Sequence, residues 1–184
     1  MVMLQRGSLL VATPAIGDPN FERTVILLLA HSPEGSLGVI LNRPSELTVR
    51  EMAPAWSTVS SEPAVVFLGG PVSPESVIHL GLARDGEAPD WWLPLHDRLG
   101  VVDGSADPDQ LRRPLSQARI FLGYAGWGPG QLKEEIDSDG WYVLPGRPSD
   151  AFSGRPELLW SRVLRRQGGE LAIVATYPTD IELN

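Results

Sequence analysis

The stretch TVILLLAHSPEGSLGVILN, residues 24–42, decides the fold class. Residues 24–31 are apolar on both alternating faces, which is typical of a strand that is buried on both sides. Residues 32–36 are turn formers, and residues 37–42 return as a second apolar run, so the stretch predicts a buried antiparallel hairpin. Because a direct hairpin interrupts a strand–helix–strand repeat, the architecture is expected to be α+β rather than a doubly wound parallel sheet.

Further strands are predicted on both sides of the hairpin, where short apolar runs lie between turn-forming residues. They cover residues 8–12, 64–68, 76–82, 101–102, 119–124, 141–144 and 171–175. For residues 76–82 a helix is the alternative, because periodicity does not separate the two structures in so short a run.

Helices are predicted where capping residues or a helical apolar period occur. Thr48 and Glu51 have the spacing of a capping box, so a short helix is expected to run to about Trp56. The other predicted helices cover residues 108–118, 131–137 and 156–167.

The composition indicates one domain, residues 1–184, because prolines and glycines are spread along the chain and leave no linker. The 42% hydrophobic content suffices for a core without crosslinks. The chain has no cysteine, which excludes disulfides, thiolate metal sites and cysteine nucleophiles. This composition fits a reducing compartment, so we expect a cytoplasmic protein.

The formal net charge of −8 disfavours binding to nucleic acids and to anionic membranes. Apolar runs are too short for a membrane span, so no membrane association is expected. Three scattered histidines without cysteine predict no metal site, and no cofactor motif is present.

The Gly-rich loop between residues 123 and 131 is the best candidate for a ligand site. It joins a predicted strand to a predicted helix, whose first N–H groups could hold a phosphate or a carboxylate. The loop lacks the dinucleotide-binding spacing, because Gln131 stands where a third Gly would fall, and Glu135 adds negative charge. A structural turn with Trp127 packed on the core is therefore the favoured interpretation.

A second candidate lies at the ends of the predicted hairpin. His31 could act as a base and Arg43 could bind an anion if strand pairing brought them together. The same residues equally suit turn hydrogen bonds, which is the favoured interpretation.

Other polar or Gly-rich positions also have a structural interpretation. Gly70 allows a sharp bend, and His79 is expected to be a hydrogen-bonded structural histidine. The arginines at 162, 165 and 166 are expected to form a solvated helix face. The full candidate surface comprises His31, Asn42, Arg43, Gly70, His79, Tyr124, Trp127, Gln131 and Glu135.

Several sequence blocks, in this order, resemble the YqgE/AlgH family of bacterial proteins. They are GSLLVA (7–12), FERTVI (21–26), HSPEG (31–35), GVILNRP (38–44), VFLGGPV (66–72), His79, GYAGW (123–127), GQL (130–132), Glu134-Glu135, Trp141, Phe152 and Leu159-Trp160. The resemblance extends across nearly the whole chain.

The resemblance implies a single domain in which a bifurcated, largely antiparallel sheet curls toward a partial barrel with helices packed outside. It carries over neither an enzymatic activity nor a cofactor, because none is settled for the family. An Asn commonly stands shortly before the tryptophan that follows the Gly-Gln-Leu helix, whereas this chain has Asp139 and Gly140 before Trp141.

These observations favour a non-enzymatic regulatory or interaction protein. Polar and Gly-rich segments at 31–44, 69–72 and 123–135 are expected to form one surface for a protein or a small anionic ligand, because functional loops gather at strand ends.

Two alternatives remain. The first is a small-molecule enzyme or binding protein acting on an anionic ligand, with His31 or Glu135 as acid–base and Arg43 as anion clamp. The second is a transcriptional regulator, which only the family name suggests, since no DNA-binding motif is present.

Overall fold

The structure is a computed structural model and describes residues 3–85, 91–111 and 113–178. Its strands, in chain order, are β1 (Ser8–Ala12), β2 (Val25–Ser32), β3 (Gly35–Ile40), β4 (Pro44–Thr48), β5 (Val65–Leu68), β6 (Val72–Ala83), β7 (Trp92–His96), β8 (Leu99–Val102), β9 (Leu115–Trp127) and β10 (Trp141–Pro145). The α-helices are α1 (Val49–Met52), α2 (Pro108–Leu111), α3 (Gln131–Asp137), α4 (Leu159–Arg165) and α5 (Gly169–Val174). Short 3₁₀ turns cover Pro54–Trp56, Pro148–Asp150 and Pro156–Leu158.

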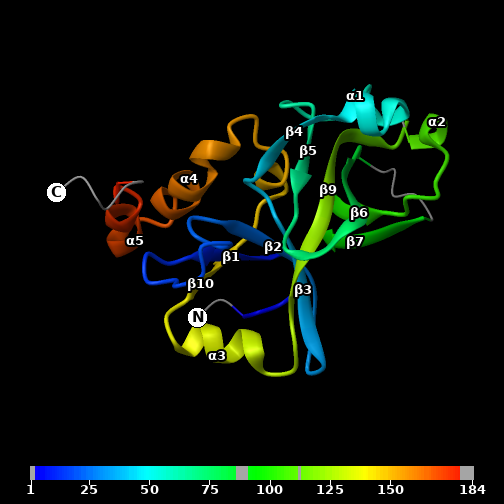
Figure 1. Cartoon of the computed structure of the whole chain (residues 1–184). Coiled ribbons are helices and arrows are strands. Elements are labelled where there is room, and N and C mark those ends of the chain that lie inside the picture. Colours follow the sequence, from blue (N-terminus) through cyan, green and yellow to red (C-terminus); the bar gives the residue numbers. More distant parts are fainter. Residues whose placement is uncertain (1–2, 86–90, 112, 179–184) are drawn as a thin grey trace.

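The long strand β9 forks the sheet. Its C-terminal residues pair with β3, and its earlier residues pair with β5 and β6. The main strand order is β10-β1-β2-β3-β9-β6-β8-β7, and the named strands pair antiparallel except β5 with β9. Figure 1 shows the two arms of the sheet curling away from β9, with helices outside. The predicted fold class, an α+β domain with a bifurcated, largely antiparallel sheet curled toward a partial barrel, is confirmed.

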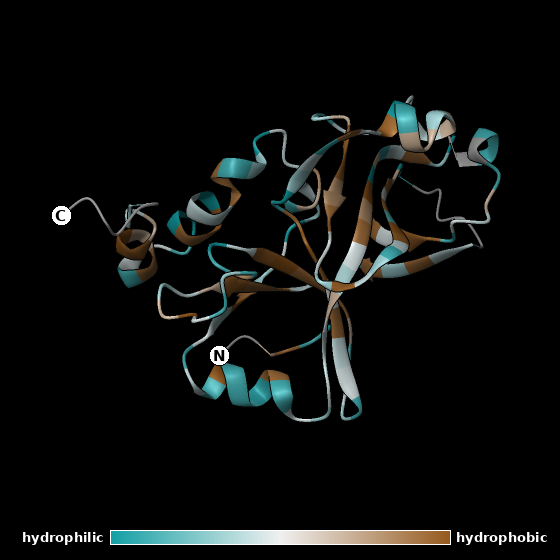
Figure 2. Ribbon diagram, in the orientation of Figure 1, coloured by the Kyte–Doolittle hydropathy of each residue, from teal (hydrophilic) through white to brown (hydrophobic). Residues whose placement is uncertain are grey.

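The predicted hairpin forms the centre of one arm. β2 pairs with β3, and its side chains alternate between two cores. Val25, Leu27 and Leu29 pack with residues of α4, whereas Ile26 and Leu28 pack with residues of β10 and α3. Figure 2 shows hydrophobic residues along β2 near the middle of the molecule, with less hydrophobic residues toward the tip of the hairpin. The apolar character of both strand faces therefore reflects helices that cover both sides of the sheet.

The predicted strand at residues 171–175 is wrong, because this segment lies in and just after helix α5. Gly168 and Gly169 both have positive φ and turn the chain after α4. Leu171 and Val174 then pack against the main core at helical spacing, and Ala175 is buried. The short apolar run is compatible with a strand or a helix, and packing against the core selects the helix.

The predicted helix at residues 108–118 is also too long. It ends at Leu111, and β9 begins at Leu115 just after Pro114, which cannot continue a helical hydrogen-bond ladder. Pairing with β6 extends the predicted strand at 119–124 back to Leu115, and pairing with β3 extends it forward to Trp127. The predicted loop at 125–130 therefore shrinks to residues 128–130.

For residues 76–82 the strand prediction is confirmed and the helix alternative is wrong, because the segment lies within β6. The last predicted helix, 156–167, begins as a 3₁₀ turn and ends as α4 at Arg165. Within the described residues, no helix has both the length and the apolar character that a bilayer crossing requires.

Candidate functional site

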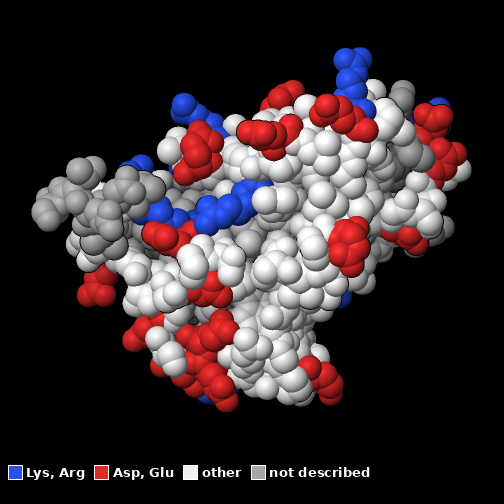
Figure 3. All heavy atoms as spheres, in the orientation of Figure 1, with Lys and Arg blue, Asp and Glu red and all other residues white. Residues whose placement is uncertain are grey.

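A cavity between α4 and the loop that follows β10 is rich in arginine; we call it the arginine pocket. Its volume is about 430 Å³. Its lining residues are Arg147, Ser149, Asp150, Ser153, Leu159, Arg162, Arg165 and Arg166. Figure 3 shows basic side chains gathered on this face near α4, with acidic side chains around them.

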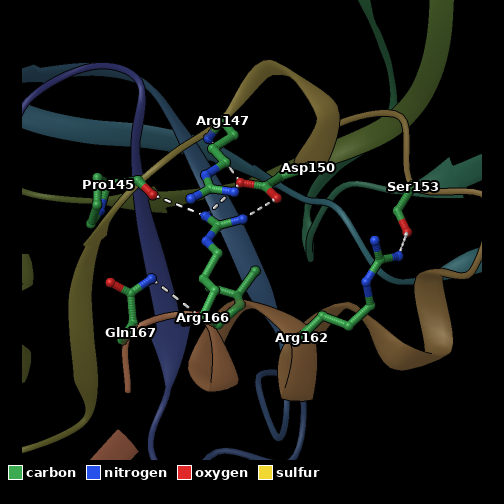
Figure 4. Close-up of polar contacts among 8 residues, drawn as sticks. Pro145, Arg147, Asp150, Ser153, Arg162, Arg166 and Gln167 are labelled. Carbon is green, nitrogen blue, oxygen red and sulfur yellow. Dashed lines mark hydrogen bonds and ion pairs between the residues drawn. The ribbon is translucent and has the colours of Figure 1, made fainter. Parts of the chain in front are cut away.

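The buried carboxylate of Asp150 holds two sides of the pocket together. Asp150 ends a 3₁₀ turn and accepts a hydrogen bond from the backbone N–H of Arg147 at 2.8 Å. Arg166 binds the same carboxylate with both terminal nitrogens, at 2.5 and 2.8 Å, and also donates to the carbonyl oxygen of Pro145 at 3.0 Å (Figure 4). This bidentate geometry fixes the Arg166 guanidinium at the wall of the cavity.

Arg147, Arg162 and Arg165 are not paired with a carboxylate in the pocket, so their charges are available to a ligand. Arg162, Arg165 and Arg166 lie on one face of α4 because of their i, i+3, i+4 spacing. Arg162 reaches Ser153 Oγ at 3.5 Å, and the Arg165 guanidinium makes no hydrogen bond or ion pair with any described residue. Arg147 is exposed on the opposite wall.

The electrostatic sign of the pocket opposes that of the chain. Its lining holds four guanidinium groups and one carboxylate, whereas the whole chain has a formal net charge of −8. Guanidinium groups bind phosphate and carboxylate oxygens in a planar, bidentate manner. The arrangement is therefore suited to a small anion.

A fifth arginine lies behind the wall of the pocket. Arg119, on β9, is only 2% exposed and stacks on the Phe67 ring at 4.2 Å. It donates to the carbonyl oxygens of Ala151 at 3.3 Å, Ser153 at 3.1 Å and Glu62 at 2.8 Å. Burial lowers its pKa to about 10, so the guanidinium stays protonated at neutral pH. It thereby holds the loop at 151–153 against the sheet.

A second cavity, the tryptophan pocket, joins three of the predicted candidates. Its volume is about 320 Å³, and its lining residues are Ala15, Ile16, Gly17, Asp18, Phe21, Gly126, Trp127, Gln131, Glu135, Ser138, Gly140 and Trp141. Glu135 Oε2 accepts from the indole N–H groups of Trp127 at 2.9 Å and Trp141 at 2.8 Å. Glu135 Oε1 accepts from Gln131 Nε2 at 3.0 Å.

The Gly-rich loop itself is closed by a side chain. Gln131 Oε1 accepts from the backbone N–H of Gly128 at 3.0 Å, which uses one of the loop donors that an anion would need. The carboxylate of Glu135 lies next to it and would repel an anion. The geometry favours the structural interpretation of this loop over a phosphate site.

His31 and Arg43 are not brought together. In the hairpin register His31 pairs with Ser36 next to the turn, and its Nδ1 lies 2.7 Å from Ser36 Oγ. Arg43 follows the other end of β3, where it donates to the carbonyl oxygen of Glu22. Antiparallel pairing places the end of the second strand beside the start of the first, which is why the two residues lie at opposite ends.

Asn42 has a structural position near Arg43. Its side chain is buried, accepts from the backbone N–H of Val25 at 2.9 Å and donates to the carbonyl oxygen of Arg23 at 2.9 Å. It therefore crosslinks the start of β2 to the end of β3.

Gly70 and Tyr124 meet through their backbones. Gly70 has φ +154°, and a Cβ added there would lie 2.2 Å from the Tyr124 carbonyl carbon. No other residue type fits so close an approach. Segments 69–72 and 123–127 are thus neighbours, and β9 also pairs with β3, but Asn42, Arg43 and His79 lie outside the tryptophan pocket.

His79 is packed against Trp56 in a stacked geometry, with ring centroids 4.3 Å apart. It is 8% exposed, and burial lowers its pKa to about 4. The imidazole is therefore neutral at physiological pH.

This burial predicts an acid-dependent loss of stability. The unfolded chain binds a proton at His79 near its ordinary pKa of about 6.5, whereas the folded chain does not until about pH 4. Acid thus favours unfolding across this window, and the free energy of unfolding should fall by about 2 kcal/mol from pH 7 to pH 5 through this residue. Urea unfolding of wild type and His79→Phe across pH measures it.

The control for that experiment is His31→Gln, which removes an exposed histidine. His79→Phe should flatten the slope of unfolding free energy against pH in this window, and His31→Gln should leave the wild-type slope. Equal slopes for wild type and His79→Phe would contradict the assignment.

Sequence reasoning missed the arginine pocket. Arg147 and Asp150 were not among the candidate residues. The arginines at 162, 165 and 166 were expected to form a solvated face; Arg162 and Arg165 are exposed, whereas Arg166 is half-buried against Asp150. The available signal was three arginines at helical spacing in an acidic chain. Among the described residues, no group of three or more His, Cys, Asp or Glu side chains could hold a metal ion.

The chain is a single α+β domain with a forked, curled, largely antiparallel sheet. The chain belongs to the AlgH-like family, whose model matches residues 9–172. The predicted family resemblance is confirmed.

Relatives resemble this chain over most of their length. A UPF0301 protein of Streptomyces avermitilis is 53% identical over 183 residues, covering 97% of this chain and 94% of that protein. The crystal structure of a Corynebacterium diphtheriae protein matches with a TM-score of 0.91 at 34% identity, covering 96% of this chain and 94% of that one. The solution structure of AlgH from Pseudomonas aeruginosa matches with a TM-score of 0.68 at 28% identity, covering 98% and 100%.

Proposed function

We propose that this protein is a cytoplasmic, non-enzymatic regulatory protein that binds a small anionic ligand in the arginine pocket. One observation carries the proposal: four guanidinium groups surround a single cavity in a strongly acidic chain, and the pocket's one carboxylate is already paired with Arg166. Arg147, Arg162 and Arg165 are exposed around this cavity, so their guanidinium groups are open to a ligand, and like charges gathered at one site attract an anion.

The volume of the arginine pocket and the electrostatic potential around it favour a small anion over a polyanion. A cavity of about 430 Å³ falls within the range of small-molecule sites. The acidic surface around the pocket repels an extended phosphate backbone, whereas a small anion can enter without approaching those carboxylates. Regulation rather than catalysis is proposed because Arg43, the clamp candidate, lies at the other end of the hairpin from His31 and does not line the cavity that holds Glu135.

Anion binding is tested by calorimetry with inorganic phosphate, pyrophosphate and citrate at constant ionic strength. At least one of these anions should bind saturably to the wild-type protein. The double variant Arg162→Gln/Arg165→Gln should weaken that binding by at least about tenfold, because each lost charge-assisted hydrogen bond contributes about 1.5–3 kcal/mol.

The matched control is Arg50→Gln/Arg98→Gln, which removes two exposed arginines outside the pocket. It should bind within about twofold of wild type, since distant surface charges are screened. Absence of saturable binding by all three anions, or equal loss in both double variants, would refute the proposal.

A further inference from the structure

The carboxylate of Glu135 has unused acceptor capacity inside the tryptophan pocket. Its Oε2 accepts from two indole N–H groups, but its Oε1 accepts only from Gln131, which leaves one lone pair there. Asp18 lines the same cavity and accepts from Asn20 through Oδ1 alone. Two carboxylate oxygens can therefore still receive donors from a ligand.

The ionisable groups of this pocket are all acidic. Asp18 and Glu135 are the ionisable side chains among the described lining residues, and no lysine, arginine or histidine lies in that lining. Lys133, on α3, is the single lysine of the chain and is paired with Asp137. The field in the cavity consequently favours a positively charged ligand.

Aromatic rings form the remaining wall. Phe21 lies 5.5 Å from Trp141 and 6.4 Å from Trp127 between ring centroids, and the two tryptophan rings lie 6.0 Å apart. Both indole N–H groups are already bound to Glu135, so the rings can attract a ligand only through their π-systems. The rings are held in place before any ligand arrives, and Phe21 is the partly exposed ring of the three, since Trp127 is 5% and Trp141 is 3% exposed; an aromatic face favours a cation.

We infer that the tryptophan pocket binds a small molecule through a primary ammonium group, which donates to Glu135 Oε1 and Asp18 and lies against the aromatic wall. The inference does not depend on the arginine pocket, because the two cavities share no lining residue.

The test uses n-butylammonium as the probe and follows the indole N–H resonances of the full chain by NMR at pH 7. n-Butylammonium should shift the Trp127 and Trp141 resonances saturably at constant ionic strength. n-Butanol and butyrate, which match its chain length without the positive charge, should not. Saturable shifts with n-butanol of the same size, or none with n-butylammonium, would overturn the inference.

Two variants test whether the carboxylate of Glu135 is the negative charge that binds the probe. Glu135→Gln keeps an oxygen acceptor for the indole groups but loses the charge, and it should weaken n-butylammonium binding by at least about fivefold. Glu134→Gln makes the same change at the neighbouring exposed residue and should alter binding by less than about twofold. Equal effects of the two variants would also overturn the inference. If Glu135→Gln does not fold, the comparison of the three probes on the wild-type protein decides.

Discussion

Replacing Arg119 with alanine should lower the free energy of unfolding by about 4 kcal/mol. The side chain is 2% exposed, so its removal opens a cavity beside Phe67. It also leaves the carbonyl oxygens of Glu62, Ala151 and Ser153 without their donor. Urea unfolding followed by tryptophan fluorescence measures the loss.

Two further variants separate the causes. Arg119→Met refills the cavity without restoring the donors, and it should recover roughly half of the lost stability. Arg98→Ala removes an exposed arginine whose ion pair with Asp85 is solvated, and it should change stability by less than about 0.5 kcal/mol. A loss below about 1 kcal/mol for Arg119→Ala would show that the buried guanidinium does not hold the 151–153 loop.

Replacing Asp150 with alanine should lower the free energy of unfolding by about 3 kcal/mol. The Asp150 side chain is 7% exposed, and the Arg166 side chain is 19% exposed, so the variant leaves a poorly solvated guanidinium without its partner. It also removes the acceptor for the backbone N–H of Arg147. Urea unfolding at low and high salt measures the loss.

A double-mutant cycle with Arg166→Ala identifies the pair as the cause. The double variant should be destabilised by clearly less than the sum of the two single variants, since each single change already breaks the same interaction. Ser149→Ala, at an exposed neighbour in the same 3₁₀ turn, should have an effect within about 0.5 kcal/mol. Strict additivity in the cycle would contradict a coupled Asp150–Arg166 pair.

The hairpin at residues 24–42 was predictable because its signals are local. Two continuous apolar runs and a turn of Pro, Glu and Gly between them lie within one short stretch, and β2 and β3 follow them closely. The capping box of Thr48 and Glu51 was predictable for the same reason, and both of its hydrogen bonds are present. The segment at 171–175 was not, since a short apolar run fits either period until packing selects one.

The two pockets also differ in how far their residues lie apart in the sequence. Gln131 and Glu135 are one helical turn apart, and Trp127 precedes them closely, so a shared position could be anticipated from the sequence. The arginine pocket is formed by a loop at 147–153 and by α4, which are distant in the sequence. Its excess of positive charge follows from the pairing of its one carboxylate, Asp150, with Arg166. Neither fact has a local signature.

The sequence by itself determined the α+β class, the central hairpin, the absence of thiol chemistry and membership of the family, because periodicity, turn residues and composition act over a few neighbouring residues. Only the tertiary structure decided that β9 forks the sheet, that His31 and Arg43 lie at opposite ends of the hairpin, and that arginines gather around one cavity. Strand register and long-range packing set those distances, and they are properties of the whole folded chain.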